Sequence, residues 1–223
     1  MRIVGGEAKG QRLKHPKTRG TRPVMDRVKT ALFDILGTRV VDTRFLDLFA
    51  GTGAVGLEAL SRGAAQATFV ELSQQVVTVL RENLRTTGLA DRAEVIRGDA
   101  FRFLEQAVIQ GRRYDLLYVA PPQYYQMAAK ALAQIERLPL TWAGALAIVQ
   151  IFPKERVDLD RLPLRKFRLV DERRYGSTLL LFYEDCVSEA PVSADYELSE
   201  AGAAPEGGQD GPDAPNALLS AED

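Results

Sequence analysis

The stretch of the sequence best suited to chemistry runs from Phe45 to Gly56 and reads Phe-Leu-Asp-Leu-Phe-Ala-Gly-Thr-Gly-Ala-Val-Gly. Its first five residues, Phe45–Phe49, are mostly bulky and apolar, as expected of a short strand that is buried on both faces. Glycines then stand at positions 51, 53 and 56, and an apolar pattern of helical period begins at Leu57. A strand, a glycine turn and a helix N-terminus are the parts of a nucleotide-binding βα unit.

Two classes of cofactor fit this unit. Gly51-x-Gly53-x-x-Gly56 matches the dinucleotide fingerprint, and Glu71 stands 20 residues after Gly51, near where a ribose-binding acid belongs. Asp47, however, would set a carboxylate beside the pyrophosphate of NAD, where negative charges repel each other. S-adenosylmethionine carries a sulfonium and an α-ammonium, so Asp47 favours that ligand; the alternative is that Asp47 only caps the helix that follows.

Composition limits the class of protein. A chain of 223 residues is long enough for one α/β domain with short additions, and we expect no transmembrane helix and no signal peptide. The single cysteine, Cys186, excludes an intramolecular disulfide and suits a reducing cytoplasm. His15 is the single histidine, so we expect no zinc site and an exposed loop residue at that position.

Charge is distributed unevenly along the chain. From Glu184 onward there are eleven acidic and no basic residues, so the 29 basic residues of the preceding part face only 19 acidic ones. The first thirty residues alone carry nine basic residues: Arg2, Lys9, Arg12, Lys14, Lys17, Arg19, Arg22, Arg27 and Lys29. A solvated surface would mix both signs, so this pattern favours a nucleic acid as partner.

The order of elements predicts an α/β architecture. Residues 2–4 and 11–13 resemble a small hairpin with Lys9, Arg12 and Lys14 on its exposed face. A helix follows from about Val24 to Leu36, with Gly37 just past its end. Next, strands at 45–49, 67–71, 93–97, 114–119 and about 145–151 alternate with helices at 55–62, 74–87, about 100–108 and 126–137. Two strands at 166–173 and 177–183 then form a hairpin. We therefore expect a doubly wound, mostly parallel, seven-stranded Rossmann-like sheet closed by an antiparallel strand, which is the methyltransferase version of this architecture.

Three regions follow from this order. We expect residues 1–40 to form a basic extension that binds RNA and residues 41–184 to form a domain with the methyltransferase architecture. In residues 185–223 apolar runs vanish and Gly, Pro, Ala, Asp and Glu dominate, so we predict a disordered acidic tail.

Acids stand at the carboxyl ends of three successive predicted strands, where ligands bind in such sheets. They are Asp47, Glu71 and Asp99, and the fourth strand runs into Ala120-Pro121-Pro122. Glu71 could accept both ribose hydroxyls, and Asp99 could bind an adenine amino group. Alternatively, Glu71 and Asp99 cap the helices that follow them.

Several segments together resemble the bacterial RsmD family. They are residues 2–6, Lys9-Gly10, Thr21-Arg22-Pro23, 26–29, 31–33, 46–53 and Gly98-Asp99-Ala100. That family methylates the exocyclic N2 of one guanine in small-subunit ribosomal RNA, using S-adenosylmethionine. The resemblance runs from Met1 to about Tyr183 and implies the same cofactor and reaction.

The resemblance also implies roles for single residues. Asp47, Gly51 and Gly53 would face the methionine part of the cofactor, Glu71 its ribose, and Asp99 and Ala100 its adenine. Phe49, Thr52 and Leu72 complete our set of cofactor-binding candidates. The RNA-binding candidates are Lys9, Arg12, Arg19, Arg22, Asp26 and Arg27.

One position departs from the family pattern. The family has Asp-Pro-Pro and an aromatic residue after the fourth strand, whereas this chain has Ala120-Pro121-Pro122-Gln123. An exocyclic amine is a poor nucleophile because its lone pair is delocalised into the purine. In the family, the acid would accept a hydrogen bond from one N–H group of the amine and so turn the lone pair toward the methyl group. The carbonyls of Ala120 and Pro121 remain, Pro122 stiffens the backbone, and Tyr124 or Tyr125 could stack on the base.

The sequence therefore predicts a cytoplasmic, monomeric RNA methyltransferase whose partner is ribosomal RNA or the small ribosomal subunit, without metal or membrane. Its catalytic candidates are Ala120, Pro121, Pro122 and Tyr124. The main alternative is a non-catalytic RNA-binding or ribosome-assembly protein that keeps this fold. An NAD-dependent oxidoreductase is the third candidate, but such an enzyme needs neither the basic extension nor Pro-Pro after the fourth strand.

Overall fold

The computed structural model describes residues 1–15, 26–122 and 126–187. The predictions for Arg19, Arg22, Tyr124 and the tail beyond position 187 lie outside these residues. The chain divides into two compact units, Met1–Ala190 and Pro191–Asp223, and every described residue belongs to the first.

The described part of the chain alternates strand and helix as the sequence predicts. The helices are α1 (Asp26–Leu36), α2 (Ala54–Ser61), α3 (Gln74–Thr87), α4 (Ala100–Ile109), α5 (Met127–Arg137) and the short α6 (Arg156–Asp160). The strands are β1 (Arg44–Asp47), β2 (Gln66–Glu71), β3 (Ala93–Arg97), β4 (Tyr114–Val119), β5 (Thr141–Ile151), β6 (Phe167–Tyr175) and β7 (Thr178–Asp185). Short 3₁₀ turns lie at Gly37–Val40, Ala90–Arg92 and Pro153–Glu155.

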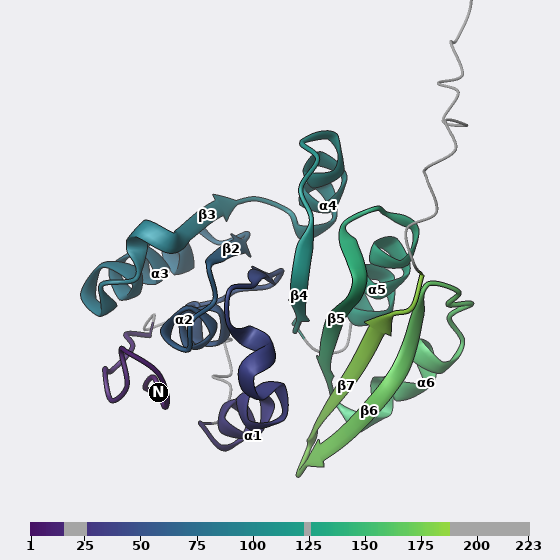
Figure 1. Cartoon of the computed structure of the whole chain (residues 1–223), viewed down its shortest axis with the longest axis horizontal. Helices are drawn as coiled ribbons and strands as arrows, with labels where there is room; N and C mark the ends of the chain where they lie inside the picture. The colour runs from purple at the N-terminus through teal and green to yellow at the C-terminus, as the bar shows by residue number, and fades with distance from the viewer. Residues whose placement is uncertain (16–25, 123–125, 188–223) are drawn as a thin grey trace, which may run out of the picture. The chain divides into compact units, whose positions relative to one another are not determined.

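The strands form one seven-stranded sheet in the order β3-β2-β1-β4-β5-β7-β6 (Figure 1). β1 to β5 run parallel, and β7 runs antiparallel to both β5 and β6. The order reverses between β1 and β4, which is the switch point where such sheets bind their ligands. The predicted fold class is thereby confirmed.

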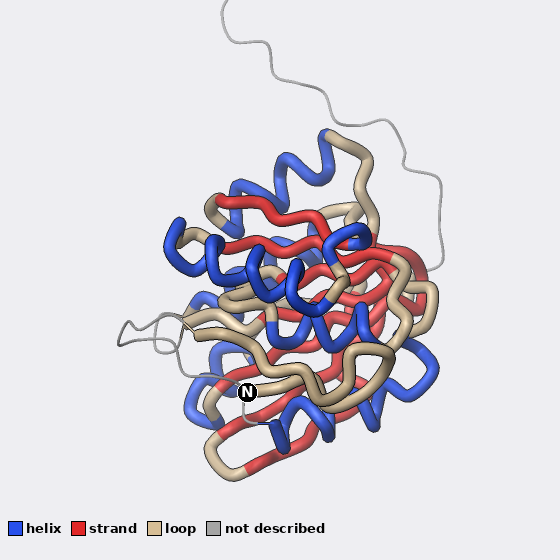
Figure 2. Tube along the Cα trace, turned by 90° about the vertical axis from the view of Figure 1, so that its left-hand side faces the viewer, coloured by secondary structure: helices blue, strands red, loops and turns tan. Residues whose placement is uncertain are grey.

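Helices pack on both faces of the sheet, as the tube view shows around the strands (Figure 2). Leu32 of α1, Leu57 of α2 and Leu80 of α3 belong to one buried cluster. Leu104 of α4 and Leu132 of α5 belong to the other. Successive residues of a strand point alternately to the two clusters. Residues two positions apart on a strand therefore face the same helices.

β5 begins four residues before the predicted position. It starts at Thr141, and its register with β4 shifts between Tyr114 and Leu116. Trp142, Ala143 and Gly144 are exposed, and Gly144 has a φ of +81°. This part of the strand therefore lacks the buried apolar run on which the sequence prediction depended.

The predicted N-terminal hairpin is only partly formed. A single antiparallel bridge joins Arg2 to Arg12, and the segment between them folds against α2 instead of extending as two strands. The amide of Ala8 donates to Ser61 Oγ at 2.9 Å. A Cβ at Gly6 would lie 1.7 Å from the Ser61 carbonyl oxygen, and the φ of Gly6 is +74°, so close docking requires glycine there.

The prediction that Lys29 belongs to the basic surface is wrong. Its side chain is fully buried, and its ammonium lies 3.0 Å from Glu58 Oε2. The same ammonium donates to the Arg2 carbonyl at 2.5 Å. Glu58 is also fully buried, and it accepts hydrogen bonds from the Val4 amide at 2.9 Å and from Arg62 Nε at 2.8 Å. The residue counted as part of the RNA-binding charge instead joins the extension to α1 and α2.

We predict that Lys29→Met destabilises the protein by about 3–5 kcal/mol, because it leaves the buried Glu58 carboxylate without its ammonium partner. Chemical denaturation monitored by circular dichroism measures the change. Arg27→Met, at an exposed position of the same helix, is the matched control and should change the unfolding free energy by less than about 0.5 kcal/mol. Equal unfolding free energies for Lys29→Met and wild type would contradict the prediction.

Candidate active site

The glycine turn between β1 and α2 needs its glycines for three different reasons. Gly51 and Gly53 have φ values of +54° and +83°, which L side chains rarely adopt. A Cβ at Gly53 would also lie 2.2 Å from Leu80 Cδ1, whereas a Cβ at Gly51 would meet nothing within 4 Å. Gly56 serves packing, because a Cβ there would lie 2.3 Å from a ring carbon of Phe69. The open side of this turn is therefore at Gly51.

Asp47 is buried at the end of β1, with 2% of its surface exposed. Its Oδ2 accepts a hydrogen bond from the Gly56 amide in the first turn of α2 at 3.0 Å, so the capping alternative is observed. Burial raises the pKa of Asp47 to about 7, with the Gly56 hydrogen bond opposing the rise and the charge of Glu71 adding to it. A cation bound beside Asp47 would favour its charged form.

Glu71 closes the turn from the neighbouring strand. Its Oε2 accepts from the Gly51 amide at 3.0 Å and its Oε1 accepts from the Ser73 amide at 2.8 Å. Both carboxylate oxygens thus hold backbone at the carboxyl edge of the sheet. Leu72, next in the chain, is 68% exposed at the same edge.

Asp99 begins α4. Its Oδ1 accepts from the amides of Phe101 and Arg102, each at 3.0 Å, which again matches the capping alternative. Ala100 is buried, and Phe101 meets Phe49 edge to face with ring centroids 6.3 Å apart. The predicted Phe49 thus contacts the first turn of α4 through Phe101, which was not among the predicted site residues.

Thr52 connects the turn to the rest of the molecule. It is buried, and its carbonyl accepts from Asn83 Nδ2 at 3.0 Å. Asn83 Oδ1 in turn accepts from the Lys14 amide at 2.8 Å. One buried amide side chain of α3 therefore holds both the glycine turn and the N-terminal segment.

The end of β4 lies at the same edge. Ala120 and Pro121 are half-buried and Pro122 is exposed. Ala120 packs on the cluster that α1, α2 and α3 cover. The edge thus holds Asp47, Glu71, Asp99 and the Ala-Pro-Pro segment, as predicted, while their contacts with a ligand stay a prediction.

Sequence reasoning missed Tyr118 and Gln150. Tyr118 is buried beside Asp47 in the strand register, and its hydroxyl donates to Gln150 Oε1 at 2.6 Å. Burial raises the pKa of Tyr118 well above its ordinary value, and the charge of Asp47 adds to the rise. The available signal was a lone glutamine within the apolar run of β5.

The predicted RNA-binding residues within the described part are on the surface. Lys9, Arg12 and Arg27 are exposed, and Asp26 is half-buried at the start of α1. His15 is exposed, as predicted. Within residues 1–15, 26–122 and 126–187, no group of three His, Cys, Asp or Glu side chains could hold a metal ion, and no helix is long and apolar enough to cross a membrane.

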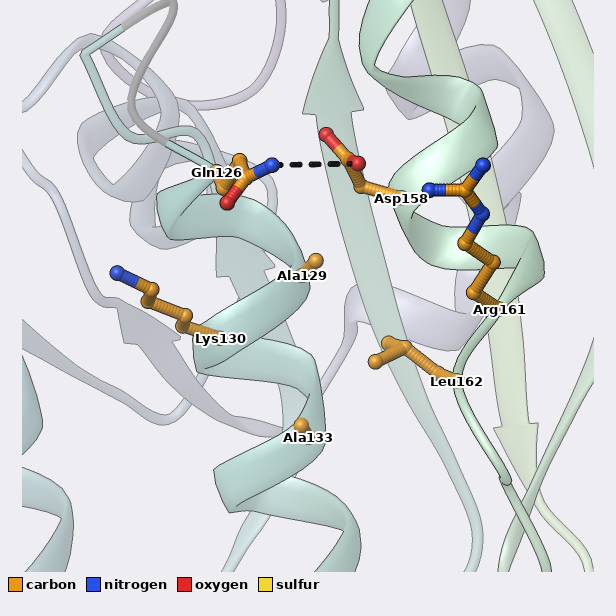
Figure 3. A pocket seen from close by; sticks show the side chains of 7 residues that line it. All are labelled: Gln126, Ala129, Lys130, Ala133, Asp158, Arg161 and Leu162. Carbon is orange, nitrogen blue, oxygen red and sulfur yellow. Dashed lines mark hydrogen bonds between the residues drawn. The ribbon is translucent and has the colours of Figure 1, made fainter.

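A groove of about 220 Å³ lies between α5 and α6 (Figure 3). Its lining residues are Gln126, Ala129, Lys130, Ala133, Asp158, Arg161 and Leu162. Gln126 reaches Asp158 across it at 3.5 Å. None of the sequence-predicted site residues lines this groove, so we distinguish it from the candidate active site.

Comparison with known proteins identifies related chains. A family model described as "Conserved hypothetical protein 95" matches residues 1–184. The Escherichia coli K12 protein named "Ribosomal RNA small subunit methyltransferase D" is 43% identical over 122 residues, which cover 55% of this chain and 60% of that protein. The chain thus aligns with less than two thirds of the length of this relative.

Solved structures agree with the fold. That of the Escherichia coli protein yhhF is 34% identical, with a TM-score of 0.72, and the match covers 83% of this chain and 98% of that one. An RNA methyltransferase from Salinibacter ruber, solved with S-adenosyl-L-homocysteine, is 16% identical with a TM-score of 0.58, covering 78% of this chain and 99% of that one. At that identity the second likeness concerns the fold alone.

We predict that Asp47 makes the stability fall as pH rises between about 4 and about 7. Its pKa is near 3.8 in an ordinary setting and about 7 in the folded chain, so the folded state binds the extra proton within that window. The loss is up to about 4 kcal/mol at pH values above the folded pKa.

Asp47→Asn keeps an oxygen that can accept from Gly56 but does not titrate. The difference in unfolding free energy, variant minus wild type, should therefore be larger at about pH 8 than at about pH 5. Denaturation of both proteins at the two pH values measures this. An identical pH response in wild type and variant would show that Asp47 keeps an ordinary pKa.

Proposed function

Because the chain belongs to the family described as "Conserved hypothetical protein 95", we propose that it is an S-adenosylmethionine-dependent methyltransferase acting on small-subunit ribosomal RNA. The family membership and the name of the Escherichia coli relative confirm the resemblance to the RsmD family. The observation that carries the proposal is the edge of the sheet where Asp47, Glu71 and Asp99 surround an open glycine turn.

The carboxylates at this edge fit a cationic nucleoside ligand. Asp47 and Glu71 interact as like charges, and burial already disfavours the charged form of Asp47. A sulfonium and an ammonium placed between the two carboxylates would reduce their repulsion and would favour the charged form of Asp47. A pyrophosphate would instead add negative charge and increase the repulsion. The side of Gly51 where a Cβ would stand is open, so a ligand can approach the backbone there.

S-adenosylmethionine, when bound, supplies a methyl group attached to a positively charged sulfur. We assign its methionine part to Asp47, Gly51, Thr52 and Gly53, its ribose to Glu71, and its adenine to Asp99, Ala100, Phe49 and Leu72. Leu72 is exposed beside Glu71, and the Phe49 ring stands against Phe101, so apolar surface is present for a purine. Asp99 would keep its cap with one oxygen and offer the other to the adenine amine.

The chain would position the RNA by two features. The exposed Lys9, Arg12 and Arg27, together with Arg19 and Arg22, would contact the phosphates, and Asp26 would contact RNA groups other than phosphate. The carbonyls of Ala120 and Pro121 would face the flipped-out base. Tyr124 would stack on that base. The target we propose is the exocyclic N2 of a guanine, modified in the cytoplasm by a monomer.

One observation favours a second function. Ala120 removes the acid that the family uses on the amine, so the chain could bind ribosomal RNA without modifying it. In that case it would act as a ribosome-assembly protein that retains the fold.

We predict that S-adenosylhomocysteine raises the melting temperature and that NAD does not. Glu71→Ala should weaken S-adenosylhomocysteine binding by about 1–3 kcal/mol, because charge-assisted hydrogen bonds to the ribose are lost. Isothermal titration calorimetry measures this change. Glu94→Ala is the control, since Glu94 lies near the amino end of β3 and pairs with Arg112. Stabilisation by NAD alone would refute the cofactor assignment.

Mass mapping of ribosomal RNA separates the two candidate functions. Small subunits from cells that lack the modification are incubated with the protein and S-adenosylmethionine. We expect one guanine of the small-subunit RNA to gain one methyl group, because the cofactor site that we propose lies beside the Ala-Pro-Pro carbonyls. Binding of the subunit without any gain of mass would favour the assembly protein.

A further inference from the structure

Ala120 carries no carboxylate, but the neighbouring strand β5 carries a polar side chain, Gln150, close to it. In the register of β4 and β5, Tyr118 lies opposite Ile148 and Val119 opposite Val149. Continued by one residue, this register sets Ala120 beside Gln150, at the strand spacing of about 4.8 Å. Gln150 is therefore the next side chain along the carboxyl edge of the sheet.

Ala120 and Gln150 share one face of the sheet. Tyr118 and Ile148 belong to the cluster covered by α1, α2 and α3, and Ala120 packs on it. Because side chains alternate along a strand, Gln150 points to the same face as Ile148. Asp47, two positions after the Phe45 of that cluster, points there as well. A polar row of Asp47, Tyr118 and Gln150 thus crosses three adjacent strands.

Tyr118 fixes the orientation of Gln150. The tyrosine is 2% exposed and its hydroxyl donates to Gln150 Oε1 at 2.6 Å. Among the described residues this is the one hydrogen bond that the Gln150 side chain receives. An amide oxygen has a second acceptor position, and Gln150 is half-buried, so that position can meet a ligand at the edge.

We propose that Gln150 is a further catalytic residue of the methyl transfer, in an inference that rests on the proposed function. Its carboxamide oxygen accepts one N–H of the guanine amine, and a backbone carbonyl of Ala120 or Pro121 accepts the other. These two contacts take the place of the carboxylate-and-carbonyl pair, and they turn the nitrogen lone pair toward the methyl group.

The methyl transfer needs no base supplied by the protein. The amine nitrogen forms a bond to the methyl carbon while the bond from that carbon to sulfur breaks with its electron pair on the sulfur, which becomes neutral. The nitrogen then loses one proton to water. Gln150 takes no proton, so a neutral amide suffices for the role.

Single-turnover methylation of small subunits that lack the modification tests the proposal. Gln150→Leu keeps the size of the side chain and removes both polar atoms. We expect it to slow the transfer at least about tenfold, less than the 10²–10³ that one preorganised contact contributes to an oxyanion site, because the amide is neutral. Its affinity for S-adenosylhomocysteine should equal that of the wild type.

Two further variants exclude a merely structural effect. Ala120→Asp in the Gln150→Leu background restores an acceptor beside the amine and should recover much of the rate. Gln66→Leu is the matched control, since Gln66 is exposed at the amino end of β2, at the edge of the sheet opposite to the candidate site. Should Gln150→Leu fail to fold, Tyr118→Phe, which removes only the hydroxyl that orients Gln150, should slow the transfer severalfold.

The outcomes are distinguishable. A slow Gln150→Leu with rescue by Ala120→Asp supports the proposal. A wild-type rate in Gln150→Leu, or in Tyr118→Phe where that variant decides, overturns it and leaves the proposed function intact. A wild-type protein that transfers no methyl group overturns the proposed function, and this inference with it.

Discussion

The buried carboxylate of Glu58 is the constraint on which the arrangement of the site depends. It accepts hydrogen bonds from Lys29 of α1, from the Val4 amide and from Arg62, the residue directly after α2. Since a buried charge left without partners is very costly, none of these three segments can move away alone. α2 begins directly after the glycine turn, so the N-terminal extension, α1 and the turn are held as one assembly.

Asn83 provides a second, neutral connection between the same parts. Its carboxamide meets the Thr52 carbonyl at one end and the Lys14 backbone at the other. An RNA contact on the extension and a ligand contact on the turn would therefore share rigid elements. We infer that orientation of the base relative to the cofactor is set by this buried framework rather than by surface charge.

Much of the fold could be predicted from the sequence because local periodicity and packing agree there. The bounds of α3, β3 and β4 match the predicted ranges, because a glycine follows α3 and β3 and Ala-Pro-Pro follows β4. β5 shows the limit: the buried Thr141 pairs with Tyr114, but the next three residues are exposed and lie where the register shifts, and a pattern of buried apolar residues cannot reveal that part of the strand.

The position of the candidate residues in the fold could be predicted, but not the contacts that they make. Acids at strand ends identify the edge, yet the same positions serve as caps, as Asp47 and Asp99 do. Lys29 was misjudged because charge counts carry no information on burial, and only the fold brings it to Glu58. Gln150 could not be connected with Ala120 either, since the two lie on different strands and only the register joins them.

The substitution at Ala120 also changes the electrostatics of the edge. Burial and the charge of Glu71 already raise the pKa of Asp47 to about 7. A third carboxylate on the same face would raise that pKa further and leave fewer Asp47 side chains charged at neutral pH. A cationic ligand would then lose part of its partner. Under the proposed function, a neutral amide at Gln150 would accept a hydrogen bond from an amine without that cost, so this edge would hold a cation and orient an amine with one carboxylate fewer.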